Sequence, residues 1–87
     1  MFENVKIIDV KNDLGQWVKL MRKKHDLTQD QLAELLNLSR ITIQNLESGK
    51  NITIDTLLKV LKHFEVLEKF NQFVQEEIKN NSYESLY

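Results

Sequence analysis

The chain contains no proline and only two glycines among its 87 residues. Proline and glycine interrupt helices more strongly than any other residues, so long stretches of this chain can be helical without a break. Along most of the chain, apolar residues also recur at steps of three and four, which is the spacing of one helix face. We therefore predict an all-α domain.

Apolar spacing and capping residues divide the chain into five predicted helices. Thr28, Ser39 and Thr53 each stand just before an apolar-periodic stretch, where a hydroxyl can accept a hydrogen bond from a free amide of the first turn. Gly49 follows the third stretch, where helices commonly end in a left-handed conformation. The predicted helices cover roughly residues 10–25, 29–36, 40–48, 54–64 and 66–79.

The two ends of the chain lie outside these helices. The segment NVKIIDV, residues 4–10, is β-branched and is predicted to form a short extended segment. A lone strand has no partner within the chain, so it would pair with another subunit or lie on the core. Asp9 or Asn12 is the expected N-cap of the first helix. The polar residues 80–87 are predicted to be a flexible tail, which leaves residues 1–79 as a single domain.

Several function classes have no support in the composition. Without cysteine the chain forms no disulfide and no thiolate metal site. We find no glycine-rich phosphate loop and no marked pair of catalytic acids, while His25 and His63 stand near helix ends. We expect no enzyme activity, no cofactor and no metal. The apolar run near the start is too short for a signal peptide or membrane span, so we expect a cytoplasmic protein without membrane contact.

The charges are distributed unevenly along a chain whose net charge is −1. Residues 1–64 hold ten Lys or Arg against eight Asp or Glu, whereas residues 65–87 hold two against five. The first part is therefore net positive and the last part net negative.

The predicted third helix has an unusual outer face. On a helical wheel, one side is formed by Ser39, Thr42, Ile43 and Leu46, and the other by Arg40, Ile41, Gln44, Asn45 and Ser48. Arginine, glutamine and asparagine can make bidentate contacts with base edges, and an exposed isoleucine can meet a thymine methyl. This pattern favours a helix that reads the major groove. On spacing alone, an ordinary surface helix fits about equally well.

The order of residues across 14–64 adds to this pattern. Matching positions are Leu14-Gly15, Arg22, Leu27-Thr28-Gln29, Leu32-Ala33, Leu38-Ser39, Thr42-Ile43, Leu46-Glu47 and Gly49-Lys50. This series resembles the Cro and phage-repressor (Xre-like) type of helix-turn-helix domain. The resemblance implies a five-helix, lambda-repressor-like domain and a transcriptional regulator that binds double-stranded DNA in a sequence-specific way, as a repressor of its target.

The resemblance also implies roles for particular residues. Gln29 matches a glutamine that binds a backbone phosphate, and Arg22 and Glu47 match an internal salt bridge. The residues that would read bases are Arg40, Ile41, Gln44 and Asn45. Further candidates for phosphate contact are Ser39, Thr42, Lys50, Asn51 and Lys24. Glu65 departs from the pattern, because the family commonly has glycine there, so the fourth and fifth helices could meet at a different angle or run on.

The predicted fifth helix carries a wide apolar face. Its members are Val66, Phe70, Phe73, Val74 and Ile78. A single reading helix contacts few base pairs, so we expect a homodimer in which this face forms the interface. The alternative is that the fifth helix only closes the core of the monomer.

A second function remains open at this point. The β-branched start followed by Asp-Leu-Gly resembles antitoxins of toxin-antitoxin pairs that neutralise HipA-type kinases and repress their own operon. Under this alternative the chain would bind a protein toxin as well as DNA.

Overall fold

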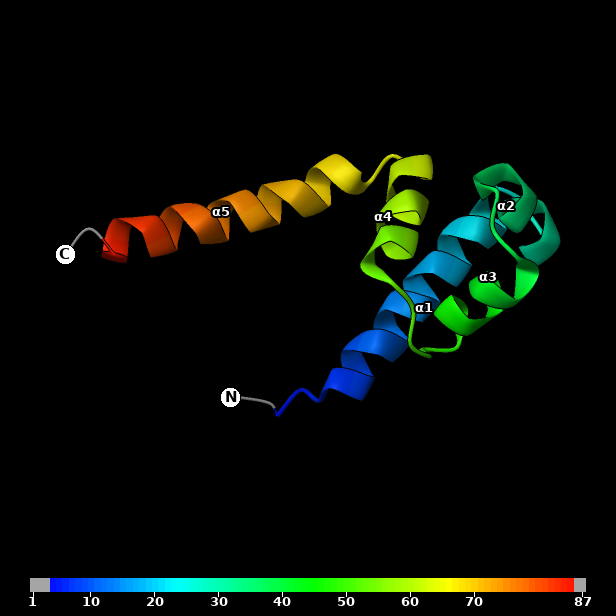
Figure 1. Cartoon of the computed structure of the whole chain (residues 1–87), viewed down its shortest axis with the longest axis horizontal. Coiled ribbons are helices and arrows are strands. Elements are labelled where there is room, and N and C mark those ends of the chain that lie inside the picture. Colours follow the sequence, from blue (N-terminus) through cyan, green and yellow to red (C-terminus); the bar gives the residue numbers. More distant parts are fainter. Residues whose placement is uncertain (1–3, 86–87) are drawn as a thin grey trace.

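The computed structural model describes residues 4–85 and contains five helices in this part of the chain (Figure 1). Within these residues there is no strand. The predicted all-α class is confirmed, and the predicted ranges agree with the observed ones except at some ends. The helices are α1 Ile7–Lys24, α2 Gln29–Leu36, α3 Arg40–Glu47, α4 Ile54–His63 and α5 Leu67–Ser85.

The second, third and fourth helices begin at the predicted hydroxyl caps. Thr28 Oγ1 accepts a hydrogen bond from Gln31 N at 3.0 Å, and Gln31 Oε1 accepts one from Thr28 N at 2.8 Å. This reciprocal pair satisfies two amides that would otherwise lack partners. Ser39 Oγ and Thr53 Oγ1 accept comparable bonds from the third residue of their own helices. Short-range chemistry therefore fixes three of the helix starts.

The ends of α1–α4 share one backbone design. Asp26, Asn37, Gly49 and Glu65 each follow a helix with φ between 56° and 77°. After each of them, the next residue donates a hydrogen bond back to a carbonyl of the last turn, as Val66 N does to Leu61 O at 2.9 Å. This is the Schellman arrangement, in which glycine is the usual residue at the left-handed position. Glu65 adopts it without being glycine, so α4 ends and α5 starts in a new direction.

The start of α1 corrects one prediction. Residues 7–10 are helical, so the extended segment predicted for residues 4–10 is wrong from Ile7 onward. Lys6 is the N-cap in place of Asp9 or Asn12, and Asp9 lies in the first turn, where its carboxylate accepts a hydrogen bond from Lys6 N at 3.1 Å. An acid in the first turn stabilises a helix start, whereas β-branched residues weaken a helix only slightly.

The end of α5 also differs from the prediction. The helix continues to Ser85, so its predicted end at residue 79 is too early. No proline or glycine interrupts this stretch, and Asn81 Nδ2 donates to Glu77 O at 2.8 Å along the helix. The flexibility expected for residues 80–87 remains a prediction, and residues 86 and 87 lie outside the described part.

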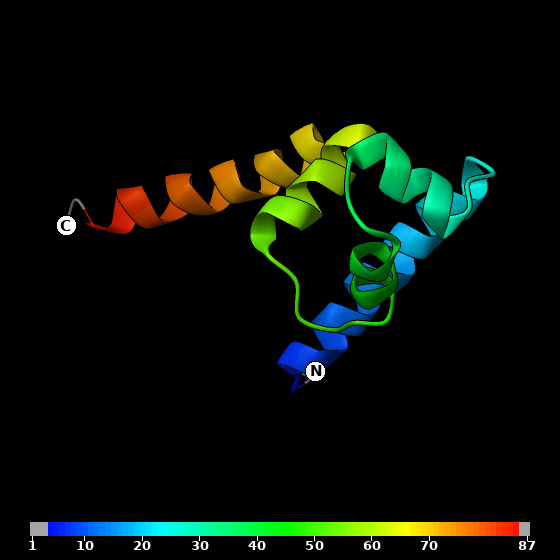
Figure 2. The ribbon, with the colours of Figure 1, turned by 45° about the vertical axis from the view of Figure 1, so that its right-hand side comes forward.

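The hydrophobic core lies among α1–α4, which we call the body. At its centre are the fully buried side chains Val18, Leu32, Ile43, Val60 and Leu61. From Leu67 to residue 82, the part of α5 whose side chains are described, no side chain is buried, although the helix packs against α4 at its start. Both views show it projecting from the body (Figures 1 and 2). α5 therefore does not close the core of the monomer.

The dimensions reflect this projection. The radius of gyration is 15.3 Å, whereas a compact domain of this length is expected near 12 Å. The principal extents are 50 × 26 × 22 Å. None of the helices in the described part is long and apolar enough to cross a membrane.

Candidate nucleic-acid interface

α3 turns two different faces to the body and to solvent. Ile43 and Leu46 are buried against the core, whereas Arg40, Ile41 and Gln44 are exposed. Ile41 keeps 65% of its surface accessible. Asn45, predicted to point outward, is only half-buried and is less accessible than the other three candidates. The exposed outer face thus centres on Arg40, Ile41 and Gln44.

An ion pair fixes the C-terminal end of α3 to α1. Arg22 Nε donates to Glu47 Oε2 at 2.6 Å and Arg22 Nη2 donates to Glu47 Oε1 at 3.0 Å, with 9% and 4% of the two side chains exposed. The third guanidinium nitrogen, Nη1, donates to Leu27 O at 2.8 Å. The hydrogen bond to Glu47 raises the pKa of Arg22 above its ordinary value, although burial opposes this shift. The bidentate geometry holds α3 in one orientation relative to α1.

Gln29 joins the same network from the first position of α2. Its Nε2 donates to Glu47 Oε1 at 3.0 Å, and its side chain is half-buried. A glutamine amide carries two N–H donors, so this bond leaves a second donor for another acceptor. Sequence reasoning assigned Gln29 to a phosphate and missed its contact with Glu47. The partner is 18 residues away, and no local pattern indicates it.

Gly15 explains how closely α1 and α3 approach each other. A Cβ atom at this buried position would lie 2.6 Å from both Leu46 O and Glu47 O. Those are backbone atoms at the end of α3, so the clash cannot be relieved by turning a side chain. The sequence included Gly15 in the resemblance without giving it a physical role. The structure shows that its missing side chain allows α3 to pack directly on α1.

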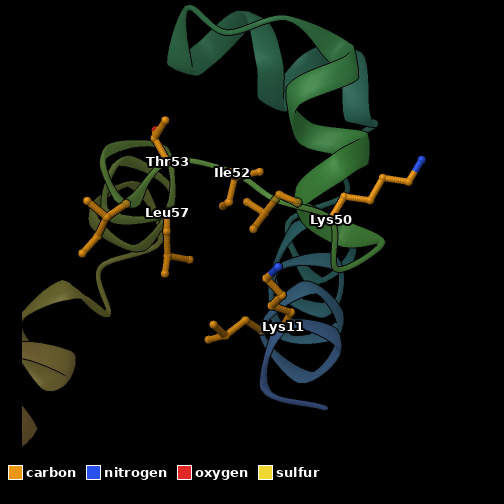
Figure 3. A pocket seen from close by; sticks show the side chains of 8 residues that line it. Lys11, Lys50, Ile52, Thr53 and Leu57 are labelled. Atoms are coloured by element: carbon orange, nitrogen blue, oxygen red, sulfur yellow. The ribbon is translucent and has the colours of Figure 1, made fainter. Parts of the chain in front are cut away.

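The loop after α3 carries two further candidates. Lys50 and Asn51 are exposed, and the Lys11 ammonium donates to Asn51 Oδ1 across the loop. Figure 3 shows Lys11 reaching from α1 into a groove of about 220 Å³, whereas Lys50 extends away from this groove beside the end of α3. Sequence reasoning missed Lys11, because it lies 40 residues from its partner.

The start of α3 has both basic and acidic neighbours. Arg40 Nε lies 3.5 Å from Asp30 Oδ1 of α2, and both side chains are more than half exposed. A solvent-exposed pair of this kind contributes little to stability and can be exchanged for a better partner. The Ser39 and Thr42 hydroxyls lie 2.8 Å apart, at the first turn of α3. Lys24, another phosphate candidate, is exposed at the end of α1, away from the loop.

The described residues contain no group of three or more histidine or acidic side chains that could hold a metal ion.

A family model described as helix-turn-helix matches residues 18–68, more than half of the chain. No curated protein matches the chain.

Proposed function

Because the chain belongs to the helix-turn-helix family of the Cro and repressor type, we propose that it regulates transcription by reading the major groove with α3. In this proposal it acts as a homodimer and represses the operator that it binds. The family is a DNA-binding one, so the finer points are the reading residues, the pairing of two chains and the direction of regulation.

The observation that carries the proposal is the chemistry of the exposed face of α3. Arg40 and Gln44 offer donors suited to base edges, and Ile41 offers an apolar contact for a thymine methyl. The only acid of α3, Glu47, is nearly buried and paired with Arg22, so it presents almost no negative charge to a phosphate backbone. A solvated helix without such a role would usually carry exposed glutamate and lysine at these positions.

Contacts with the phosphate backbone would surround this face. Gln29 has a second amide N–H at the start of α2, where the helix dipole also favours an anion. Ser39 and Thr42 provide hydroxyls at the start of α3, and Lys50 provides an ammonium after its end. Asn51 and Lys24 complete the set of candidates. Asn45 would contribute through the part of its side chain that stays accessible.

Pairing of two chains would give the affinity that one short helix lacks. α3 has eight residues and can reach only a few base pairs. The apolar face of α5 would supply the contact through Val66, Phe70, Phe73, Val74 and Ile78. Phe73 and Ile78 remain 63% and 50% exposed in the single chain, so they would gain most from a partner.

The direct test is operator affinity by fluorescence anisotropy, using a DNA site selected with the wild-type protein. Arg40→Ala should weaken binding by about 1 to 3 kcal/mol at that site and relax preference at one base pair. Lys50→Ala is the matched control, because it should weaken all DNA sequences alike. Unchanged affinity in Arg40→Ala would show that α3 does not read this DNA as proposed.

Salt dependence provides an independent test of the phosphate contacts. Each neutralised phosphate contributes about 0.9 to the slope of log affinity against log salt, so two or three contacts in each subunit imply a slope of roughly −4 to −5 for a dimer. A slope near zero would argue against DNA as the partner.

The antitoxin function is the alternative, and it is compatible with DNA binding. Its support is the set of exposed apolar side chains at the start of α1, among them Ile7 and Ile8, with 78% and 50% of their surface accessible. This surface would receive a HipA-type kinase. A kinase-like gene next to the gene for this chain, and a stable complex of the two purified proteins, would support it. Without both, the regulator function stands alone.

A further inference from the structure

Two apolar grooves meet on the side of the molecule from which α5 projects. The first, about 220 Å³, lies between α1, the loop after α3 and the start of α4, and Leu14 and Ile54 are among its lining residues. The second, about 520 Å³, lies in the corner between α4 and α5, where Ile54, Leu58, Phe70 and Val74 contribute. Ile54 lines both, so the grooves form one continuous surface, which we call the cleft.

The cleft is open in the single chain. Ile54, at its middle, is 69% exposed, and Val10 on the neighbouring turn of α1 is 45% exposed. In both ribbon views α5 and the N-terminal half of α1 extend to the side away from α2 (Figures 1 and 2). The exposed side chains of α3, Arg40, Ile41 and Gln44, are not among the residues that line the cleft.

We propose that the cleft receives the outer half of α5 from a second copy of this chain, so that each body holds its partner's helix. This inference rests on the homodimer of the proposed function and adds the surface that receives α5. An exchange of this kind is isologous: the helix of one copy meets the body of the other, and the reverse contact forms at the same time.

The outer half of α5 has the shape required of an occupant. Phe73 and Ile78 are exposed, and Val74, which precedes Ile78 by four residues, lies between their two rows on the helix surface. Helices that dock in grooves present apolar side chains at such intervals. No side chain described on α5 is buried in the single chain, so the helix is available for intermolecular packing.

The charges of the two surfaces favour a second copy over an unrelated helix. Lys11 points into the first groove, and its ammonium has donors beyond the one bound to Asn51 (Figure 3). The outer half of α5 carries Glu76 and Glu77 beside its apolar residues. Residues 1–64 are net positive and residues 65–87 net negative, so the helix of one copy is attracted to the body of another.

The first experiment separates the cleft from α5 itself by sedimentation of single variants. Ile54→Glu places an acid on an exposed position in the first turn of α4, where the helix dipole tolerates it, so the fold should persist by circular dichroism. We expect it to raise the dimer dissociation constant at least about thirtyfold, as loss of a central contact does. Leu35→Glu is the matched control, because Leu35 is 57% exposed on α2 and lies outside the cleft.

The results distinguish a wrong proposal about the cleft from a wrong proposal about the homodimer. Suppose that the Ile54→Glu variant is folded and dimerises like the wild type, while the Phe73→Glu variant is monomeric. This result would contradict docking in the cleft and would indicate that the two α5 helices contact each other instead. A wild type that stays monomeric at tens of micromolar would remove the homodimer itself. DNA binding by α3 is measured separately and does not depend on either result.

Crosslinking tests the geometry directly, because the chain has no cysteine of its own. Ile54→Cys and Ile78→Cys are prepared as separate proteins of different size, mixed, and treated with a short bismaleimide. The proposal predicts a crosslink between the two different chains. Crosslinks only between two copies of Ile78→Cys would instead show that the α5 helices pair with each other, and would contradict it.

Discussion

The body and α5 are stabilised in different ways. In the body, five side chains are fully buried. The backbone at the end of α3 packs directly on Gly15 of α1, and a bidentate ion pair connects the same two helices. α5 is the longest helix of the described part, yet none of its side chains up to residue 82 is buried. The body is thus shaped by contacts within one chain, whereas α5 leaves the apolar side chains of Phe73 and Ile78 exposed. Both regions nevertheless show the same sequence pattern, in which apolar residues recur at steps of three and four.

The ion pair should show the largest effect on the body. Arg22→Met leaves the Glu47 carboxylate in a site with 4% exposure and without its cation, so we expect a loss of about 3 to 5 kcal/mol in the free energy of unfolding. Urea denaturation followed by circular dichroism measures it. The double variant Arg22→Met with Glu47→Leu should be less destabilised, because no charge is then stranded. Equal losses in the single and double variants would contradict this account of the pair.

Gly15 tests the close approach of α1 and α3. Gly15→Ala forces a Cβ atom to within 2.6 Å of two backbone oxygens, so we expect a loss of about 3 kcal/mol despite alanine's better helix propensity. Gln16→Ala is the control, since Gln16 is exposed on the same helix and should change stability by less than about 0.5 kcal/mol. Similar stability for both variants would mean that α3 can move away from α1 without cost.

α5 should respond in the opposite way to the body. Phe73→Glu changes a side chain that is 63% exposed, so the isolated monomer should keep its stability to within about 0.5 kcal/mol. Its association should nevertheless be lost, so the thermal midpoint should no longer rise with protein concentration as that of a dimer does. Thermal scans across a range of concentrations measure this. A large loss of monomer stability would place α5 in the core, contrary to the comparison.

The junction between the two regions should show the smallest effect. Glu65 has φ = 61°, a conformation that disfavours residues with a Cβ atom and suits glycine. We expect Glu65→Gly to stabilise the chain by about 1 kcal/mol, because glycine is preferred at this position of the Schellman turn. Chemical denaturation measures the change. Destabilisation would show that the greater freedom of glycine in the unfolded chain outweighs the relieved strain.

The sequence predicted most of the body because its signals are local. Hydroxyl caps, apolar spacing and Gly49 define α2, α3 and α4. The helical wheel correctly predicts that Arg40, Ile41 and Gln44 are exposed, but Asn45 is half-buried rather than outward, and Ser39 is exposed rather than packed. Failures occurred where the deciding contact is distant or weak. The hydrogen bonds from Gln29 to Glu47 and from Lys11 to Asn51 join residues that are far apart in the sequence and meet only after folding. No local sequence pattern predicts either bond. The β-branched start of α1 has extended propensity, but Asp9 in the first turn favours a helix there.

The end of α5 was missed for a related reason. Polar composition suggested a tail after residue 79, but a helix without proline or glycine can continue as long as its backbone bonds form. Helix termination by composition is a weaker signal than the four left-handed turns that end α1–α4. Three of those turns use Asp26, Asn37 and Glu65, which sequence reasoning did not assign to this role.

The central claim is that α3 of the body reads bases while α5 pairs two bodies. Selection of binding sites from random DNA tests this claim most directly. The wild type should enrich two inverted half-sites whose centres lie about 10 base pairs apart, one turn of the duplex. Phe73→Glu should enrich the same half-site singly, and Arg40→Ala should lose preference at one base pair of it. The account would be contradicted if the wild type enriched no sequence, or if Arg40→Ala selected the same sites as the wild type.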